Sequence, residues 1–266
     1  MTASAERWRE ALAAWAIPDE ILSRATRSPW ELPVGRFAAR ADDAVAHPSG
    51  WSHDRAGSGL QAGGSILDVG AGAGAASLPH VARVGRHGLV TAVDSSPAML
   101  EAFAAAADGR VQHAEVVGAW PGMAATVDVH DVVVAHHVAY NVADLEPFVI
   151  ALTSHARGCV VVELPPRHPM SWANPLWEQF WDLRRPTSPT ADDFVDVVRD
   201  TGVRDLVVYR WSRRDPDNTP LDERVSLVAQ RLCLPVDREP EVRQALESMP
   251  PANRREVVTV AWAGRA

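Results

Sequence analysis

The sequence contains no lysine, so every cationic side chain apart from histidine is an arginine. A mechanism through a Schiff base on a lysine amine is therefore excluded. Cysteine is scarce, because only Cys159 and Cys233 occur, both in or beside apolar runs. Without the paired spacing of a zinc site, we expect buried thiols, no metal site and a reducing, cytoplasmic location. No run approaches the ~20 apolar residues of a membrane span, and Met1–Arg9 lacks the apolar core of a secretion signal.

The overall charge is acidic, and this bears on the class of partner. The chain has 266 residues, 47% of them hydrophobic, so it can bury one large core. A formal net charge of -8 argues against binding nucleic acid, which depends on clustered cations. Arg210, Arg213 and Arg214 could still form a local basic patch, although a solvated strand end is the simpler interpretation. The composition therefore favours a small-molecule partner.

A glycine-rich turn organises the rest of the chain. The apolar run 66–69 predicts a buried strand, and the alternating glycines at Gly70, Gly72 and Gly74 predict a tight turn into a helix over 75–84. The same residues fit a dinucleotide-binding pattern and the pattern D-x-G-x-G-x-G, which begins at Asp68. Because a carboxylate would repel a pyrophosphate, Asp68 favours a cofactor that carries an ammonium group.

Apolar runs alternate with helical patterns through the remaining sequence. Strands are predicted over 88–94, 111–117, 127–135, 158–164, 203–211 and 256–262, and helices over 98–107, 142–153, 190–201, 221–234 and 239–248. Helical patterns over 5–16, 19–26 and 35–46 come first, and 47–64 is predicted to be a loop. We therefore predict an α/β fold: a Rossmann-like, seven-stranded, mostly parallel sheet with helices on both faces. Residues 1–60 would form an N-terminal helical extension to a domain over 61–266, with a Pro/Trp-rich insertion near 165–189.

Several motifs together resemble the class I S-adenosylmethionine-dependent methyltransferases. The residues Leu67-Asp68-Val69-Gly70-Ala71-Gly72-Ala73-Gly74 resemble the first motif of that family, and Val93-Asp94-Ser95-Ser96-Pro97-Ala98-Met99-Leu100 resemble the second. The segment 131–138 resembles the fourth-strand motif, and 144–148 the helix that follows it. The resemblance covers roughly residues 60–165. It implies a methyltransferase with S-adenosylmethionine as its cofactor.

The resemblance also implies roles for individual residues. Gly70, Gly72 and Gly74 would let the backbone pass the methionine part of the cofactor, with Asp68 holding the ammonium group directly or through water. Asp94 would bind both ribose hydroxyls, Ser95 and Met99 would flank the adenine, and His136 would lie near the methionine. Packing in the core is the alternative for Met99, and a helix cap or core partner for Asp68.

The loop after the third predicted strand departs from the family pattern. Many relatives have an acid there that binds the adenine amino group, whereas this chain has Gly118-Ala119-Trp120. A backbone contact from Ala119 and packing by Trp120 would have to replace that acid. The departure gives weight to an alternative function, a protein that binds the cofactor without catalysis.

Candidate catalytic residues follow the fourth predicted strand. His136, His137 and Tyr140 would lie at the carboxyl ends of the strands, where open α/β sheets bind ligands, and histidine is suited to accept a proton near neutral pH. Glu163 and His168 form a second candidate pair at the end of the fifth strand.

We expect the acceptor to be a small, partly apolar molecule. The N-terminal helices and the 165–189 insertion would cover the site, and its walls would be aromatic: Trp30, Phe37, Trp172, Trp177, Phe180 and Trp181. Alternatives are an RNA or protein methyltransferase and, against the charge of Asp68, an NAD-dependent oxidoreductase. The sequence carries no signal for an oligomeric state.

Overall fold

A seven-stranded sheet forms the centre of the computed structural model, which describes residues 1–31, 33–214, 219–250 and 254–265. The strand order is β3-β2-β1-β4-β5-β7-β6. The strands are β1 (Ser65–Val69), β2 (Leu89–Asp94), β3 (Gln112–Val117), β4 (His130–His136), β5 (Ala156–Leu164), β6 (Val207–Arg214) and β7 (Arg254–Ala263). The first five are parallel, and β7 pairs antiparallel with both β5 and β6. The predicted Rossmann-like, mostly parallel sheet is confirmed.

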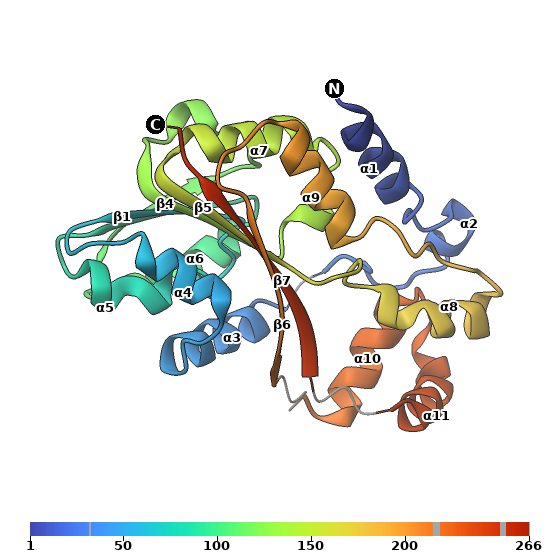
Figure 1. Ribbon diagram of the computed structural model, residues 1–266. Helices are drawn as coiled ribbons and strands as arrows, with labels where there is room; N and C mark the ends of the chain where they lie inside the picture. The colour runs from blue at the N-terminus through green and yellow to red at the C-terminus, as the bar shows by residue number, and fades with distance from the viewer. Residues whose placement is uncertain (32, 215–218, 251–253, 266) are drawn as a thin grey trace.

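Helices cover both faces of the sheet, as Figure 1 shows. One face carries α3 (Val34–Ala46), α4 (Trp51–Ser58), α5 (Val81–Val84) and α6 (Pro97–Ala107), and the other carries α1 (Ala3–Ala13), α7 (Leu145–Ser154) and α9 (Ala191–Asp200). Short 3₁₀ turns lie at Leu78–His80, Ala124–Thr126, Ala139–Asn141, Ser171–Ala173 and Val236–Arg238. Because the central strands are buried on both sides, their apolar runs are continuous rather than alternating.

A third group of helices lies beside the sheet and has its own apolar core. It consists of α2 (Asp19–Leu22), α8 (Asn174–Trp181), α10 (Leu221–Arg231) and α11 (Glu239–Ser248). Trp177 and Phe180 are buried in this core. Trp181 packs against it and donates a hydrogen bond to the carbonyl of Leu232 at 2.7 Å. The expectation that these aromatic side chains wall an acceptor pocket is wrong for Trp177 and Phe180, because helices inserted between β6 and β7 cover them. Trp30 and Trp172 are exposed on the surface.

Two local predictions before and after β1 are also wrong. The segment 47–64, predicted as a loop, contains α4, and the helix predicted over 75–84 is reduced to the 3₁₀ turn Leu78–His80 followed by the single turn of α5. The Gly, Ser and His residues of α4 have little helix propensity, but Ser52, His53, Ala56 and Gly57 are buried. Packing against β4, β5 and β7 therefore outweighs propensity.

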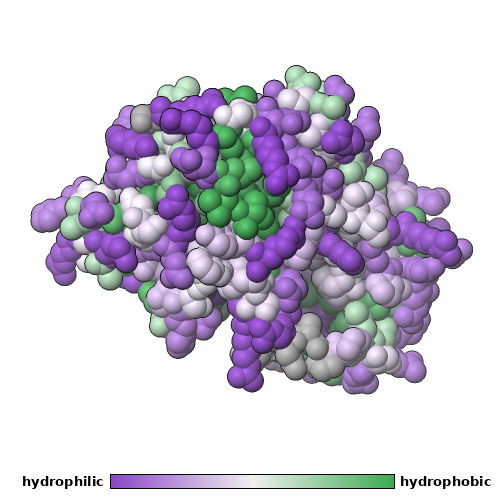
Figure 2. All heavy atoms as spheres, viewed as in Figure 1, coloured by the Kyte–Doolittle hydropathy of each residue, from purple (hydrophilic) through white to green (hydrophobic). Residues whose placement is uncertain are grey.

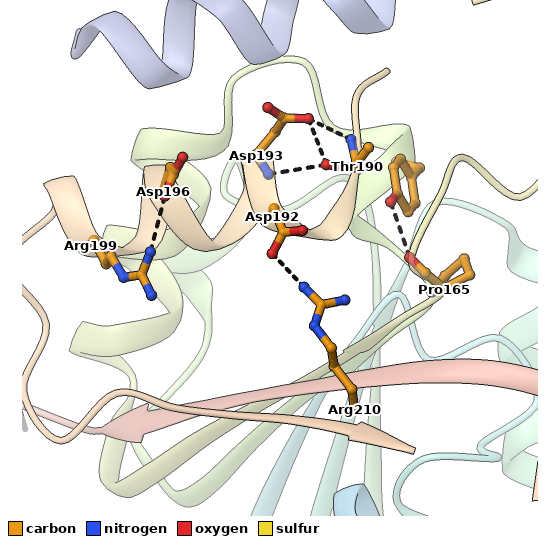
Figure 3. Close-up of polar contacts among 8 residues, drawn as sticks. Pro165, Thr190, Asp192, Asp193, Asp196, Arg199 and Arg210 are labelled. Carbon is orange, nitrogen blue, oxygen red and sulfur yellow. Dashed lines mark hydrogen bonds and ion pairs between the residues drawn. The ribbon is translucent and has the colours of Figure 1, made fainter. Parts of the chain in front are cut away.

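The helix α9 shows how local signals were sufficient elsewhere (Figure 3). Thr190 and Asp193 form a reciprocal capping box, in which the Thr190 hydroxyl accepts from the Asp193 backbone and Asp193 accepts from the Thr190 backbone. Phe194, Val197 and Val198 are buried on the inner face of this helix, whose position the sequence predicted at 190–201. Gly202 follows the helix at a φ of +70° and its backbone N–H donates to the carbonyl of Arg199, an arrangement typical of a glycine that ends a helix.

The surface in the view of Figure 2 is mainly polar, with apolar side chains gathered over the edge strand β6 and its neighbour β7. None of the described helices is both long and apolar enough to cross a membrane.

Candidate functional site

The turn between β1 and α5 requires glycine at its predicted positions. Gly70, Gly72 and Gly74 have φ values of +68°, +53° and +93°, a region that other residues rarely adopt. A Cβ atom on Gly70 would lie 2.4 Å from Val138, and one on Gly74 would lie 2.6 Å from Leu78. Above Gly72 the space is open, since a Cβ atom there would have its nearest neighbour, on Phe37, at 3.8 Å. The backbone at Gly72 is thus available to a ligand, and α3 lies over it.

Asp94, at the end of β2, ties this turn to the start of α6. Its Oδ2 accepts a hydrogen bond from the Gly72 backbone at 2.8 Å, and its Oδ1 accepts one from the Ser96 backbone at 2.9 Å. Each carboxylate oxygen can accept a further bond, so the group fits a pair of ribose hydroxyls. Ser95 is exposed beside it, whereas Met99 is buried, with its side chain packed inside the fold. The structure therefore brings Asp94 and Ser95 to the glycine turn and favours core packing for Met99.

Asp68 is fully buried and only half satisfied. Its Oδ2 accepts a hydrogen bond from the Ser77 hydroxyl at 2.6 Å, while its Oδ1 has no partner among the described residues. Burial raises the pKa of Asp68 to about 7, with a further increase from Asp94, and the Ser77 hydrogen bond opposes the shift. A buried carboxylate with a free oxygen next to a glycine turn fits the ammonium group of an amino-acid-bearing cofactor.

In the loop after β3, the two residues predicted to contact the cofactor differ in exposure. Ala119 is exposed. Trp120 is only 7% exposed, and its ring meets that of His155 edge-to-face at 4.9 Å on the side of the sheet covered by α7. The Trp120 ring therefore offers little surface for stacking on an adenine.

Tyr140 is held by the fold rather than directed into an open site. Its hydroxyl donates to the carbonyl of Pro165 at 3.0 Å, and its ring stacks on Trp8 at a centroid distance of 5.4 Å. Burial raises the pKa of Tyr140 above its ordinary value. These contacts argue against Tyr140 as a proton acceptor.

Glu163, at the end of β5, is the centre of a polar group that also contains His137. The Glu163 side chain is 2% exposed, and its Oε1 contacts His137 Nε2 at 3.2 Å and an Arg213 nitrogen at 3.3 Å. Burial acts to raise its pKa, but the hydrogen bond from His137 and the positive charge of Arg213 outweigh it and lower the pKa. Oε2 has no partner within the described part of the chain. Glu163 thus stays ionised with one oxygen free.

The second residue of the predicted Glu163 and His168 pair lies elsewhere. His168 stacks on Trp15 at a ring distance of 3.9 Å and accepts a hydrogen bond from the Met170 backbone. Burial lowers the pKa of His168 to about 4. The pair predicted from the sequence is therefore not formed, and Glu163 pairs with His137 and Arg213 instead.

His136 belongs to a cluster of three histidines that sequence reasoning missed. Its ring lies 5.8 Å from that of His53 in α4, which in turn lies 5.5 Å from that of His80. Burial is the main cause that lowers the pKa of all three, to about 3 for His136 and about 4 for His80, so the rings are neutral at pH 7. Three ring nitrogens, His53 Nδ1, His80 Nε2 and His136 Nε2, are buried without a hydrogen-bond partner in the described ranges.

The register of the sheet places this cluster beside Glu163. His136 is paired with Glu163 across β4 and β5, and Glu163 with Thr259 across β5 and β7, so the three side chains share one face. The first turn of α4 covers them, with Ser52 bonded to the Thr259 hydroxyl at 2.7 Å. An unsatisfied buried polar atom costs about 1–3 kcal/mol, so four such atoms together indicate a place built for a ligand. No three His, Cys, Asp or Glu side chains of the described residues are arranged to hold a metal ion.

Comparisons with known proteins agree with the geometry of the site. Residues 66–156 match a family model described as a methyltransferase domain, and the match includes the glycine turn, Asp94 and His136. A cyclopropane-fatty-acyl-phospholipid synthase-like protein from Lactobacillus casei is 16% identical over 92% of this chain and 98% of its own, with a TM-score of 0.53. A proposed sarcosine dimethylglycine methyltransferase from Galdieria sulphuraria is 15% identical over 98% of each chain, with a TM-score of 0.50. These two likenesses establish the fold.

Among curated protein sequences, none matches the chain significantly.

Proposed function

We propose that this chain, in which residues 66–156 match a methyltransferase domain, is a class I S-adenosylmethionine-dependent methyltransferase that methylates a small molecule bound at the carboxyl ends of β4 and β5. The cofactor supplies a methyl group on a sulfonium centre. The protein's contribution is then to align the acceptor and exclude water. A base is required only where the acceptor must lose a proton.

The cofactor would be held by the residues of the glycine turn and its neighbours. Gly72 offers open backbone, Asp94 offers one further acceptor site on each oxygen, and the free Oδ1 of Asp68 offers a partner for an ammonium group. Ser95 and the backbone of Ala119 are exposed where they could meet the adenine. Within this arrangement His136 lies on the methionine side, because β4 is the neighbour of β1.

The observation that supports a small acceptor is the cover over the site. Phe37 of α3 lies over the glycine turn, and the first turn of α4 is fixed to β7 through Ser52 and Thr259. A folded protein or an RNA duplex could not reach atoms buried beneath these helices. Two of the three arginines considered as a basic patch are engaged in ion pairs, Arg210 with Asp192 (Figure 3) and Arg213 with Glu163.

We infer that the lid is confined to part of the N-terminal extension. Trp8 of α1 is fully buried and donates to the carbonyl of Val142 at 2.8 Å, so α1 acts as a permanent part of the core. The segment from α3 to α4 lies over the carboxyl edge, and Gly50 between these helices packs against Trp211. Opening of this segment would admit the acceptor.

The test begins with binding. In titration calorimetry, we expect S-adenosylhomocysteine to bind and NAD not to bind. Asp94→Ala should weaken S-adenosylhomocysteine binding by about 100-fold or more, because it removes two charge-assisted contacts and loosens the turn. Asp108→Ala, on an exposed aspartate at the end of α6, is the matched control and should bind as the wild type does.

Methyl transfer is tested with isotopically labelled S-adenosylmethionine and an extract of the source organism, separated by size after the reaction. Label in the low-mass fraction supports the proposal. Label only in protein or RNA would contradict the acceptor class. Binding of the cofactor without any transfer would favour the alternative, a silent cofactor-binding protein, which the missing acid at Ala119 supports.

A further inference from the structure

Four unpartnered polar atoms at the carboxyl edge of β4 and β5 limit the chemistry of the acceptor. Among the described residues they are Glu163 Oε2, His53 Nδ1, His80 Nε2 and His136 Nε2, all buried. Ring contacts link the three histidines, and strand register links His136 to Glu163, so the atoms belong to one cluster. The proposed methylation brings a molecule to this edge of the sheet.

Glu163 is the member of the cluster whose hydrogen-bonding role is fixed. An ionised carboxylate can only accept hydrogen bonds, whereas a neutral imidazole has one donor and one acceptor nitrogen. Arg213 and His137 both approach Oε1, and they leave Oε2 for another group. The occupant must therefore donate a hydrogen bond to Oε2.

The local charge distinguishes between the possible donors. Burial keeps the three histidines neutral, so the charge at the inner side of the cluster is that of the Glu163 carboxylate. Arg213 compensates this charge from the outer side, where its side chain is 31% exposed, and His137 contacts the same oxygen, Oε1. A group that is itself cationic gains more from the free oxygen than a hydroxyl does.

We propose an acceptor subsite for a small amine, bound in its ammonium form by Glu163 and lined by His53, His80 and His136. This inference rests on the proposed methyl transfer.

The chemistry balances with the residues present. The bound ammonium group first gives one proton to water, and Glu163 Oε2 accepts a hydrogen bond from an N–H that stays on the nitrogen. The freed nitrogen lone pair then forms the bond to the methyl carbon, as the bond from that carbon to sulfur breaks and its electron pair stays on sulfur. The product is a methylated ammonium ion, which again donates a hydrogen bond to Glu163 Oε2.

The first readout is the identity of the product, and it needs no variant. Wild-type protein is incubated with ¹³C-methyl-labelled S-adenosylmethionine and the low-mass extract, and the labelled product is identified by mass spectrometry and NMR. A new N-methyl group on an amine is the expected result. Labelled O-, S- or C-methyl products would overturn the amine subsite while leaving the proposed function intact. Absence of any low-mass product would overturn the proposed function itself.

The second readout tests Glu163. Glu163→Gln keeps the shape and the contacts at Oε1 but places an amide NH₂, a donor, where Oε2 must accept. We expect kcat/KM for the amine identified above to fall about 10- to 100-fold. S-adenosylhomocysteine binding, measured by calorimetry, should stay within about twofold of wild type, which also shows that the variant is folded.

The matched control is Glu178→Gln, because Glu178 of α8 is an exposed partner of Arg184 and α8 belongs to the separate helical group with its own core. It should leave both kcat/KM and cofactor binding unchanged. Equal activity of Glu163→Gln and Glu178→Gln toward the amine would overturn the subsite.

Discussion

The two ends of β4 carry histidines in opposite situations. At the amino end, His130 is 1% exposed and both ring nitrogens are engaged, Nδ1 with the carbonyl of Asp128 at 2.7 Å and Nε2 with the Thr91 hydroxyl at 2.8 Å. At the carboxyl end, His136 Nε2 is buried without a described partner. The hydrogen-bonding capacity of the histidine ring is therefore filled at the amino end of β4, whereas at the carboxyl end one ring nitrogen lacks a partner. The difference indicates that the carboxyl edge is arranged for a ligand, and the amino edge for stability.

Substitution of one acid at each edge, Asp68 in β1 and Asp131 in β4, should give the largest difference in stability between the two edges. The pKa of Asp68 is raised from 3.8 to about 7, so folding takes up a proton between these values and the charge of Asp68 destabilises the fold as pH rises through this window. Asp68→Asn should therefore raise the free energy of unfolding at pH 8, by up to about 4 kcal/mol, and have little effect at pH 4. Urea unfolding at the two pH values measures this.

Asp131 at the amino end is the matched acid and should behave in the opposite way. Burial acts to raise its pKa, but hydrogen bonds from the backbone and hydroxyl of Ser65 and from Arg157 lower it. Its stabilisation is present above the ordinary aspartate pKa and is lost as pH falls. Asp131→Asn should thus reduce stability at pH 8 by less than about 1 kcal/mol, because the side chain is partly exposed. Two variants with the same pH dependence would contradict the distinction between the edges.

The two histidines of β4 provide the next test. His130→Leu leaves the Thr91 hydroxyl and the Asp128 carbonyl without their partner, and should cost about 3 kcal/mol in the free energy of unfolding. His136→Leu removes a nitrogen that already lacks a partner, so its stability should stay within about 1 kcal/mol of wild type.

Methyl-transfer activity should depend on the two histidines in the opposite order, with the larger loss in His136→Leu. Methyl transfer should fall at least about tenfold in His136→Leu, because the substitution removes a polar group from the proposed subsite, and persist in folded His130→Leu. Urea unfolding and the labelled-methyl assay, run on both variants, measure the two properties. A large stability loss in His136→Leu would show that the carboxyl end is as structurally satisfied as the amino end.

The cofactor half of the site was predictable because its signals are local. The order of strand, glycine turn and acid fixes Gly70, Gly72 and Asp94 within a short segment, and Ser96 and Pro97 begin α6 as their capping and first-turn preferences predict. The turn demands glycine for steric reasons that do not depend on distant residues, apart from the contact of Gly70 with Val138.

The acceptor half was not predictable, because it depends on contacts between distant segments. His53 lies in a segment whose composition indicates a loop, and it reaches His136 only because tertiary packing makes α4 a helix. Glu163 was identified at the correct strand end, but its partner was not, since Arg213 comes from β6 across the sheet. The apolar stripe of α8 likewise gave no information about which helices would cover it.

The smallest effects concern the arginines that pair with an acid at each edge. Arg157 and Asp131 at the amino edge are 54% and 37% exposed, so Arg157→Gln should change the free energy of unfolding by less than about 0.5 kcal/mol. Arg213 is 31% exposed, but its partner Glu163 is only 2% exposed, so Arg213→Gln should cost about 1 kcal/mol.

The pH dependence of the Arg213→Gln effect separates lost charge from lost packing. The pKa of Glu163 is lowered in the fold, so the stabilisation from its charge is present above the ordinary glutamate pKa and declines as pH falls. The difference between Arg213→Gln and wild type should therefore be larger at pH 8 than at pH 4 in urea unfolding. A difference that is equal at both pH values would mean that Arg213 contributes only its side-chain contacts, and that His137 alone keeps Glu163 ionised.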